Sequence, residues 1–310
     1  MPGIGATLFA LGSACAYGAG DFVGGRAATR LPTLTVLLIA QLGASALAVA
    51  VAWRVGNGPV LPSAALLGAI GGLCHVAAVG CLYHGLAHGR ITIVAPVSGV
   101  LNIALPALVD GLAVHGLGML QAAGILLAGV AVCMITKGVA EADRRSATPV
   151  LSIGLGVASG LLFGASDLAV GSVAVDQTSG AVMAARLIGT MGVAVTVLIV
   201  FARRLTVICL RRLLPAQALV AAHRRPALDR SQLTAGIAMA LSAGLLDCGG
   251  HLAYAESAAL GELSSAVAVT AMFPAVSVLL AIVVLKERIG RLQSLGLGVS
   301  AGAVVMLAGA

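Results

Sequence analysis

The sequence predicts an all-α integral membrane protein with ten transmembrane helices, arranged as two inverted repeats of five. Hydrophobic residues make up 60% of the 310 residues and charged residues only 9%, whereas a soluble domain carries about 25% charged residues. The sequence YGAGD at Tyr17–Asp21 also reappears as FGASD at Phe163–Asp167, 146 residues later. Such self-similarity indicates a duplicated chain, and each copy carries an acid within an apolar stretch.

Ten apolar stretches approach the roughly 20 residues that a membrane span requires. Turn-forming or charged clusters separate them, such as Gly56–Pro59 and Lys286–Arg288. The predicted spans are 4–25, 33–53, 63–86, 91–109, 117–136, 151–171, 180–201, 233–256, 262–285 and 292–309.

Small residues predict close packing of these helices. The chain has 41 glycines and only 3% aromatic residues, and small side chains let helix backbones approach where lipid provides no hydrophobic drive. The six cysteines are scattered without metal-binding or redox spacing. We therefore predict no metal and no cofactor.

The two repeats are predicted to cover residues 1–140 and 150–310. A second internal match supports this division, because Gly85–Gly89 aligns with Ser257–Gly261, and Gln121 with Gln293, at a shift of 172 residues. Five spans per repeat is an odd number, so the second copy enters the membrane in the opposite sense. Inverted repeats place a substrate site near the midplane, where the halves meet, and permit alternating access.

Residues 202–232 form the one long connection, inserted in the second repeat. Seven arginines interleave with apolar residues there. One interpretation is a basic amphipathic segment on anionic headgroups; the other is a disordered basic loop that acts only as a topology signal. All basic residues except Arg54 and Arg186 follow odd-numbered spans, which makes those connections cytoplasmic and both termini external by the positive-inside rule. This bias explains the +7 charge without nucleic acid.

The chain resembles the drug/metabolite transporter superfamily in its ten-helix EamA-type branch. The resemblance rests on Tyr17-Gly18 in the first span, on Tyr254-Ala255 and Pro274, and on Leu285-Lys286-Glu287-Arg288 followed by Gln293. Arg186 falls where that family often has an arginine early in the second helix of a repeat. Two departures are the acids of both copies and His115 in place of a second Glu287.

The resemblance implies a secondary transporter in the cytoplasmic (plasma) membrane that moves a small metabolite or drug-like solute and exports it. It also implies cytoplasmic termini, opposite to the charge count, so the orientation stays open. Proton coupling, uncoupled facilitation and a sugar-linked substrate are open alternatives. The predicted partners are the substrate, the lipid bilayer and protons, for a monomer or homodimer that is not an enzyme.

Asp247 is the most deeply placed acid, near the centre of the eighth span, and His75 is its counterpart in the third. His251 and Tyr254 continue the face of Asp247. Because charges inside membrane spans are costly and usually functional, this stripe is the leading candidate for substrate or proton binding. The alternative is a polar contact between helices that has no further role.

Asp21 and Asp167 occupy equivalent places near the ends of the first and sixth spans. Each is either a helix-end charge or a carboxylate that faces a central cavity. Arg186 lies at a depth similar to that of Asp167, and pairing lowers the cost of burying either charge. We therefore predict a structural Asp167–Arg186 pair, with direct binding of an anionic substrate by Arg186 as the alternative.

Pro96, Pro106 and Pro274 interrupt the fourth and ninth spans and are candidate hinges, or simple packing kinks. An intramembrane aspartyl protease is a remote alternative, since Gly18–Asp21 matches GxGD and Pro106–Leu108 matches PAL. The second catalytic aspartate is absent from the expected preceding span, which disfavours that activity. The chain also has no phosphate-binding loop of the GxxxxGK[ST] type.

Overall fold

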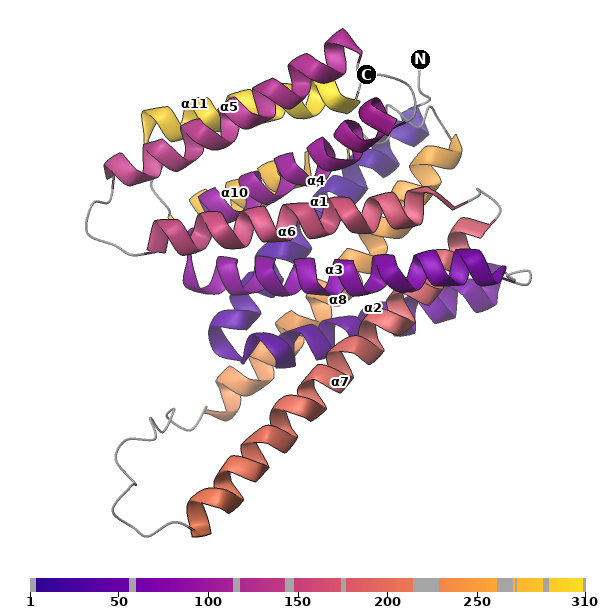
Figure 1. The fold of residues 1–310 in the computed structure, drawn as a ribbon, viewed down its shortest axis with the longest axis vertical. Helices are drawn as coiled ribbons and strands as arrows, with labels where there is room; N and C mark the ends of the chain where they lie inside the picture. The colour runs from indigo at the N-terminus through magenta and orange to yellow at the C-terminus, as the bar shows by residue number, and fades with distance from the viewer. Residues whose placement is uncertain are drawn as a thin grey trace.

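The computed structural model describes residues 4–55, 60–113, 118–142, 148–173, 177–213, 229–260, 270, 272–286 and 290–308. Within these ranges the chain is all-helical, with ten α-helices and no strand (Figure 1). The helices of the first half are α1 (Ile4–Arg30), α2 (Thr33–Val55), α3 (Pro62–His88), α4 (Ile91–Ala113) and α5 (Met119–Ala142). Those of the second half are α6 (Thr148–Gly171), α7 (Thr178–Leu213), α8 (Arg230–Leu260), α10 (Phe273–Leu285) and α11 (Arg291–Ala308).

The helices lie where the apolar stretches predict them. The predicted ninth span, 262–285, is described as a helix only from Phe273, and the start of that prediction lies outside the described residues. The predicted break after it is confirmed, since α10 ends at Leu285 and Lys286 adopts a left-handed conformation that terminates helices. Five helices in the described residues are long and apolar enough to cross a membrane, which indicates a membrane protein.

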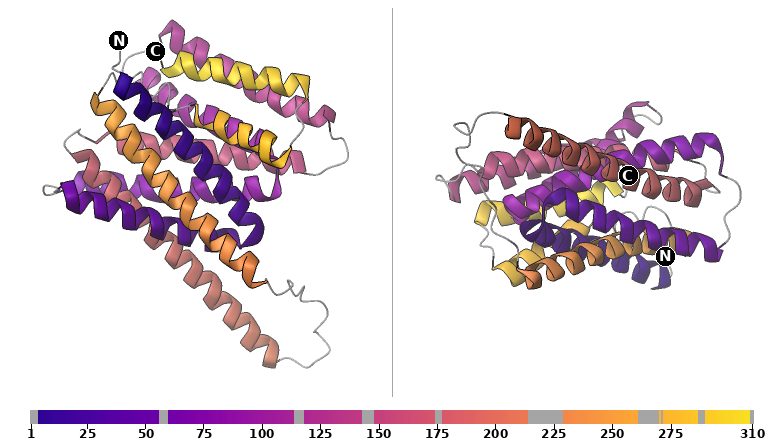
Figure 2. Two further views of the ribbon diagram at one scale, coloured as in Figure 1. Left: turned by 180° about the vertical axis from the view of Figure 1, so that it is seen from behind. Right: turned by 90° about the horizontal axis from the view of Figure 1, so that it is seen from below.

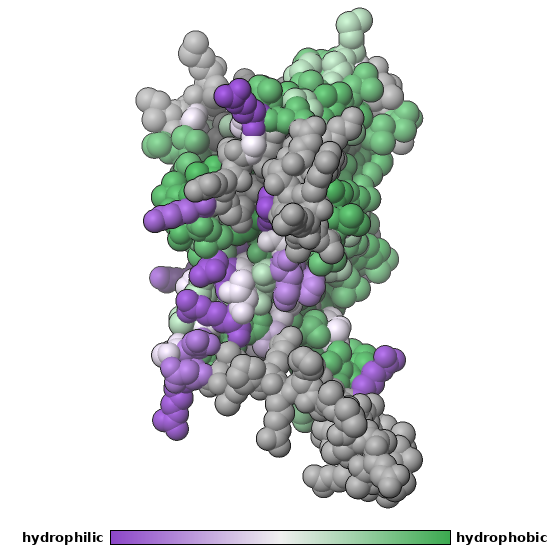
Figure 3. Space-filling model, turned by 90° about the vertical axis from the view of Figure 1, so that its left-hand side faces the viewer, coloured by the Kyte–Doolittle hydropathy of each residue, from purple (hydrophilic) through white to green (hydrophobic). Residues whose placement is uncertain are grey.

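Large apolar side chains cover much of the outside of this bundle. Leu126, Leu198, Leu279 and Val283 are among the exposed ones, and hydrophobic side chains dominate much of the face shown in Figure 3. An apolar exterior suits helices whose solvent is lipid.

Helix α7 is too long to be a membrane span alone. Its 36 residues extend about 54 Å, against a hydrocarbon thickness of about 30 Å, and its apolar part ends at Arg203. Figures 1 and 2 show the helix continuing beyond the rest of the bundle. The first part of the predicted connection 202–232 is therefore helical, up to Leu213, and residues 214–228 lie outside the described range.

Helices from the two halves pack against one another throughout the bundle. Helix α1 packs along α8 and α3 along α6, while α2 contacts both α7 and α8. Helices α5 and α11 lie side by side at one edge (Figures 1 and 2). The close crossings use glycine: a Cβ atom at Gly72 would overlap the carbonyl of Ala185 on α7, and one at Gly244 would overlap that of Ala40 on α2.

Candidate functional site

An arginine, an aspartate and a histidine from three helices meet in the middle of the bundle. Arg186 on α7 is 4% exposed, and its Nη1 donates to Oδ2 of Asp247 on α8. His75 on α3 lies with its Nε2 3.6 Å from the same carboxylate oxygen and 3.4 Å from Arg186 Nη1. The ion pair reduces the cost of holding each charge away from water. The predicted Asp167–Arg186 pair is wrong, because Asp247 takes that role.

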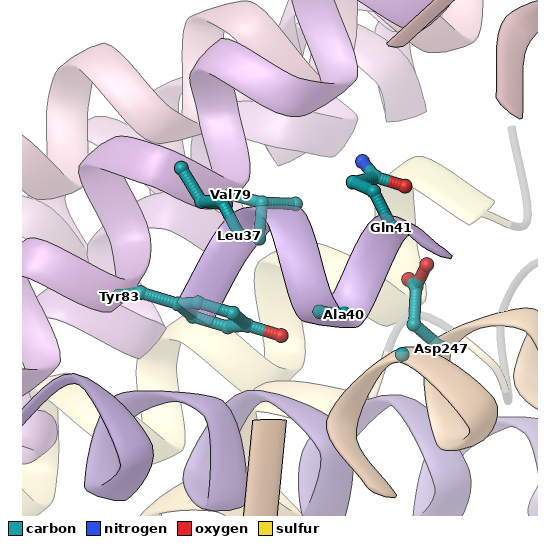
Figure 4. Close-up of a pocket in the computed structure, with 7 residues that line it drawn as sticks. Leu37, Ala40, Gln41, Val79, Tyr83 and Asp247 are labelled. Atoms are coloured by element: carbon teal, nitrogen blue, oxygen red, sulfur yellow. The ribbon is translucent and has the colours of Figure 1, made fainter. Parts of the chain in front are cut away.

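Gln41 on α2 completes this group, which we call the central polar cluster: Gln41, His75, Arg186 and Asp247. Gln41 and Asp247 both line a small cavity, together with Tyr83 (Figure 4). The cavity admits about one water molecule. Gln41 is 5% exposed and its Oε1 has no partner in the described residues, nor has Nη2 of Arg186. The cluster therefore retains an unsatisfied acceptor and an unsatisfied donor.

The cluster consists of pairs of equivalent positions from the two halves. His75 and Asp247 are related by the 172-residue shift, and Gln41 and Arg186 by a shift of 145 residues. The same shift relates Ser45 to Thr190, whose hydroxyl oxygens lie 2.8 Å apart. The hydroxyl of Ser45 contacts the carbonyl oxygen of Arg186 at 3.1 Å, and that of Thr190 contacts the carbonyl oxygen of Gln41 at 3.3 Å.

A second pair of equivalent hydrogen bonds flanks the cluster. Ser13 on α1 donates to the carbonyl of Gly250 on α8 at 2.8 Å, and Ser159 on α6 donates to that of Ala78 on α3 at 3.0 Å. The two donors are 146 residues apart and the two acceptors 172. The register found in the sequence therefore also relates contacts in space.

Aromatic rings contact two histidines of this region. Tyr17 on α1 contacts His251 edge-on, with ring centroids 6.4 Å apart, and its equivalent Phe163 on α6 contacts His75 at 5.3 Å. The predicted stripe on α8 thus divides: Asp247 binds Arg186, and His251 packs against Tyr17. Tyr254 lies farther along α8, within electrostatic range of Asp167.

The two equivalent aspartates have different surroundings. Asp21 on α1 is partly buried and lies near Tyr83 and Asp247, with which it interacts electrostatically. Asp167 on α6 is exposed, and the side chain of Asn102 on α4 lies near it. The ion pairs of the described residues include no cation for Asp167.

The prolines have separate positions. Pro96 and Pro106 lie inside α4, whereas Pro274 is in the first turn of α10, where proline is well tolerated. Whether Pro274 interrupts a longer helix depends on residues 261–269 and 271, which lie outside the described residues. Pro96 and Pro274 both line an apolar cleft between α4, α10 and α11.

Sequence reasoning missed Gln41 and Asn102. An alignment of the second helix of each half would have placed Gln41 opposite Arg186, but no comparable signal identifies Asn102. The described residues contain no group of three His, Cys, Asp or Glu side chains that could hold a metal ion.

Comparisons with known proteins give a similarity of fold and no family. No protein-family model matches the chain, and no curated protein does. A solved structure, described only as the crystal structure of a protein, is similar to it with a TM-score of 0.53, over 97% of each chain and at 16% sequence identity. At this identity the similarity concerns the fold and carries no activity.

Proposed function

We propose that this protein is a secondary transporter, which moves a small metabolite or drug-like solute across the cytoplasmic membrane by alternating access. The observation that carries the proposal is the central polar cluster, an ion pair with His75 and Gln41 where α2, α3, α7 and α8 meet. Ionisable groups inside membrane bundles are costly and are typical of substrate and proton pathways. Apolar helices alone would pack without them.

The helix contacts support two inverted repeats. If the halves are equivalent, α1 corresponds to α6, α2 to α7 and α3 to α8. The α1–α8 contact then corresponds to an α6–α3 contact, and the α2–α8 contact to an α7–α3 contact. All four contacts are present. Residues at the centre of this correspondence contact their own equivalents, as Ser45 contacts Thr190. An axis between equivalent halves is where transporters of inverted-repeat type bind substrate.

One pair of contacts departs from this correspondence, and it supports alternating access. Helix α1 packs against α3, whereas α6 and α8, their equivalents, have no comparable contact in the described part of the chain. The α1–α3 side is thus closed and the α6–α8 side open. An exchange of the two halves would produce a second state in which α6 meets α8 and α1 leaves α3.

The resemblance to the EamA-type branch of the drug/metabolite transporters also supports this proposal. The two departures from that family's pattern, the acids of both copies and His115, still apply. Export, proton coupling and membrane orientation remain parts of the proposal that the cluster does not decide. Asp21 lies near Asp247 as a protease dyad would require, but the carboxylate of Asp247 is bound by Arg186. The contacts therefore favour transport over proteolysis.

The alternating-access part is tested by distances on the two sides of the protein. Spin labels at Thr29 and His88 report the α1–α3 side, and labels at Ser172 and Glu256 report the α6–α8 side; all four positions are exposed. The six native cysteines are first replaced by serine or alanine. In proteoliposomes we expect two distance populations per pair, with the short population of one pair accompanying the long population of the other. Fixed, single distances in both pairs would contradict the proposal.

Proton coupling is tested in the same proteoliposomes. A trapped pH-sensitive dye records proton flux when a defined panel of amines, amino acids and sugars is added singly. We expect flux with at least one class, and its loss in Asp247→Asn. Substrate-driven flux that is unchanged in both Asp247→Asn and Asp21→Asn would exclude these acids from coupling.

A further inference from the structure

The last turn of α3 carries two histidines on one face of the helix. His84 and His88 are four residues apart, a spacing that places side chains one above the other. Their rings stack, with centroids 4.3 Å apart and an angle of 29° between the ring planes. His88 is exposed and His84 is partly buried. The pair is therefore accessible from outside the bundle, and neither histidine belongs to the central polar cluster.

Hydrogen bonds orient both rings through the same nitrogen atom, Nδ1. Nδ1 of His88 lies 3.1 Å from the carbonyl oxygen of His84; because a carbonyl oxygen only accepts, this Nδ1 carries a proton. Nδ1 of His84 lies 3.5 Å from the hydroxyl oxygen of Thr33 on α2, which can also accept a hydrogen bond. A neutral imidazole with its proton on Nδ1 has its free lone pair on Nε2. Such hydrogen bonds from the other ring nitrogen are typical of histidines that bind metal ions.

The spacing of the pair suits two ligands of one metal ion. Histidines at positions i and i+4 on one face of a helix bind zinc in known proteins. Zinc–nitrogen bonds of about 2.0–2.1 Å place two neighbouring ligand atoms about 3–3.4 Å apart. The rings of His84 and His88 are separated by little more than this, and rotation of the exposed His88 ring can bring the two Nε2 atoms together. The C-terminal end of a helix also favours a cation, because its dipole is negative there.

The ligand atoms select the kind of metal. Imidazole nitrogen suits Zn²⁺, Cu²⁺ and Ni²⁺, whereas Mg²⁺ and Ca²⁺ prefer oxygen ligands. Helix α3 contains no acid, and no third His, Cys, Asp or Glu side chain joins the pair in the described part of the chain. Water therefore has to complete the coordination. Among these metals, Cu²⁺ binds nitrogen ligands most tightly.

We propose that His84 and His88 form a binding site for a divalent transition-metal ion, held by Nε2 of each ring. The site lies where α3 ends, before its connection to α4 and beside Thr33 at the start of α2. A bound ion joins two successive turns and so stabilises the end of α3. The sequence prediction of no metal rested on the spacing of the cysteines, which this pair does not involve. The site is also independent of the proposed transport function.

The test uses the full chain with a purification tag that contains no histidine, in nanodiscs of neutral phosphatidylcholine at pH 7. Electron paramagnetic resonance of added Cu²⁺ counts the coordinated imidazoles, and we expect two. Competition with a fluorescent zinc indicator measures the affinity for Zn²⁺. Thermal unfolding should shift to higher temperature with added Zn²⁺, since an ion that binds only the folded state stabilises it. Mg²⁺ at the same concentration should have no effect.

Substitutions then locate the site. His84→Gln and His88→Gln each remove one ligand and keep a polar side chain. Each should lower the affinity for Zn²⁺ by at least about tenfold, since even the loss of an outer-shell partner costs about 10- to 100-fold. The two-imidazole signal of Cu²⁺ should disappear in both variants. His115→Gln and His223→Gln change histidines elsewhere in the chain and are the controls, in which affinity should not change. Gel filtration confirms that each variant is folded.

Three results would overturn the metal site. The first is a wild-type protein that binds no Cu²⁺ through two imidazoles. The second is an unchanged two-imidazole signal or Zn²⁺ affinity in folded His88→Gln, which would place the bound ion elsewhere. The third is stabilisation by Mg²⁺ equal to that by Zn²⁺, which would show a general effect of divalent cations rather than coordination by imidazole.

Discussion

The α1–α3 side and the α6–α8 side of this protein correspond through the internal sequence matches, but they differ in packing in the described residues. On the first, Gly24 and Gly25 of α1 lie directly against Tyr83 and Leu86 of α3. On the second, α6 and α8 stand apart and leave Asp167 exposed. Helices with matching sequence segments thus need not pack alike, because the side chains at each contact decide how closely the helices approach.

The central polar cluster joins the two sides, and its removal should have the largest effect. Arg186→Met leaves Asp247 charged and unpaired, for which we expect a loss of about 3–5 kcal/mol in the free energy of unfolding. Gln41→Met, at the equivalent position of the first half, removes no charge and should cost less. Unfolding in mixed micelles, titrated with sodium dodecyl sulfate, measures both. Equal losses in Arg186→Met and Gln41→Met would contradict the expected cost of leaving Asp247 charged and unpaired.

Alanine substitutions at the two glycine crossings should lower the free energy of unfolding by similar amounts. An alanine at Gly72 would overlap the backbone of Ala185, and one at Gly244 that of Ala40. Because backbone atoms cannot move aside as the end of a side chain can, we expect each substitution to lower the free energy of unfolding by about 1–3 kcal/mol. The same titration measures both variants. A strong effect at one crossing and none at the other would contradict their equivalence.

A methyl group added at Gly24 should separate α1 from α3. Gly24→Ala places a Cβ atom against the ring of Tyr83, a contact that Tyr83 can partly relieve by moving. We expect a smaller destabilisation, of about 1–2 kcal/mol, and a longer distance between spin labels at Thr29 and His88. Gly12→Ala on the same helix is the control, because nothing lies within 4 Å of its added Cβ atom. An unchanged distance in Gly24→Ala would mean that Tyr83 does not hold this side closed.

The smallest effect concerns the equivalent serines. Ser13→Ala and Ser159→Ala each remove one hydrogen bond to a carbonyl on a neighbouring helix. Hydrogen bonds between membrane helices contribute about 0.6 kcal/mol on average, so each variant should lose about that much in the same titration. A loss confined to one serine would show that the flanking contacts differ in strength.

Local sequence features predicted the helices well. Apolar length and turn residues locate α1 to α8 and α11 because a membrane span depends on composition over some twenty residues. The partner of Arg186 could not be found in this way. Depth along the helices favoured Asp167, whereas the observed pairing with Asp247 depends on how α7 crosses α8. The predicted seventh span also ended at residue 201, short of the end of α7 at Leu213, since arginine has a good helix propensity that a topology argument ignores.

The sequence by itself determined the all-helical apolar character, the duplicated register and the identity of the buried ionisable residues. These follow from residue type and spacing, which act locally. Only the tertiary structure decided that Arg186 pairs with Asp247, that Gln41 lines the same cavity, and that Asp21 is partly buried while Asp167 is exposed. Those outcomes depend on the angles and separations of packed helices, which small residues such as Gly72 and Gly244 permit but which no single helix specifies.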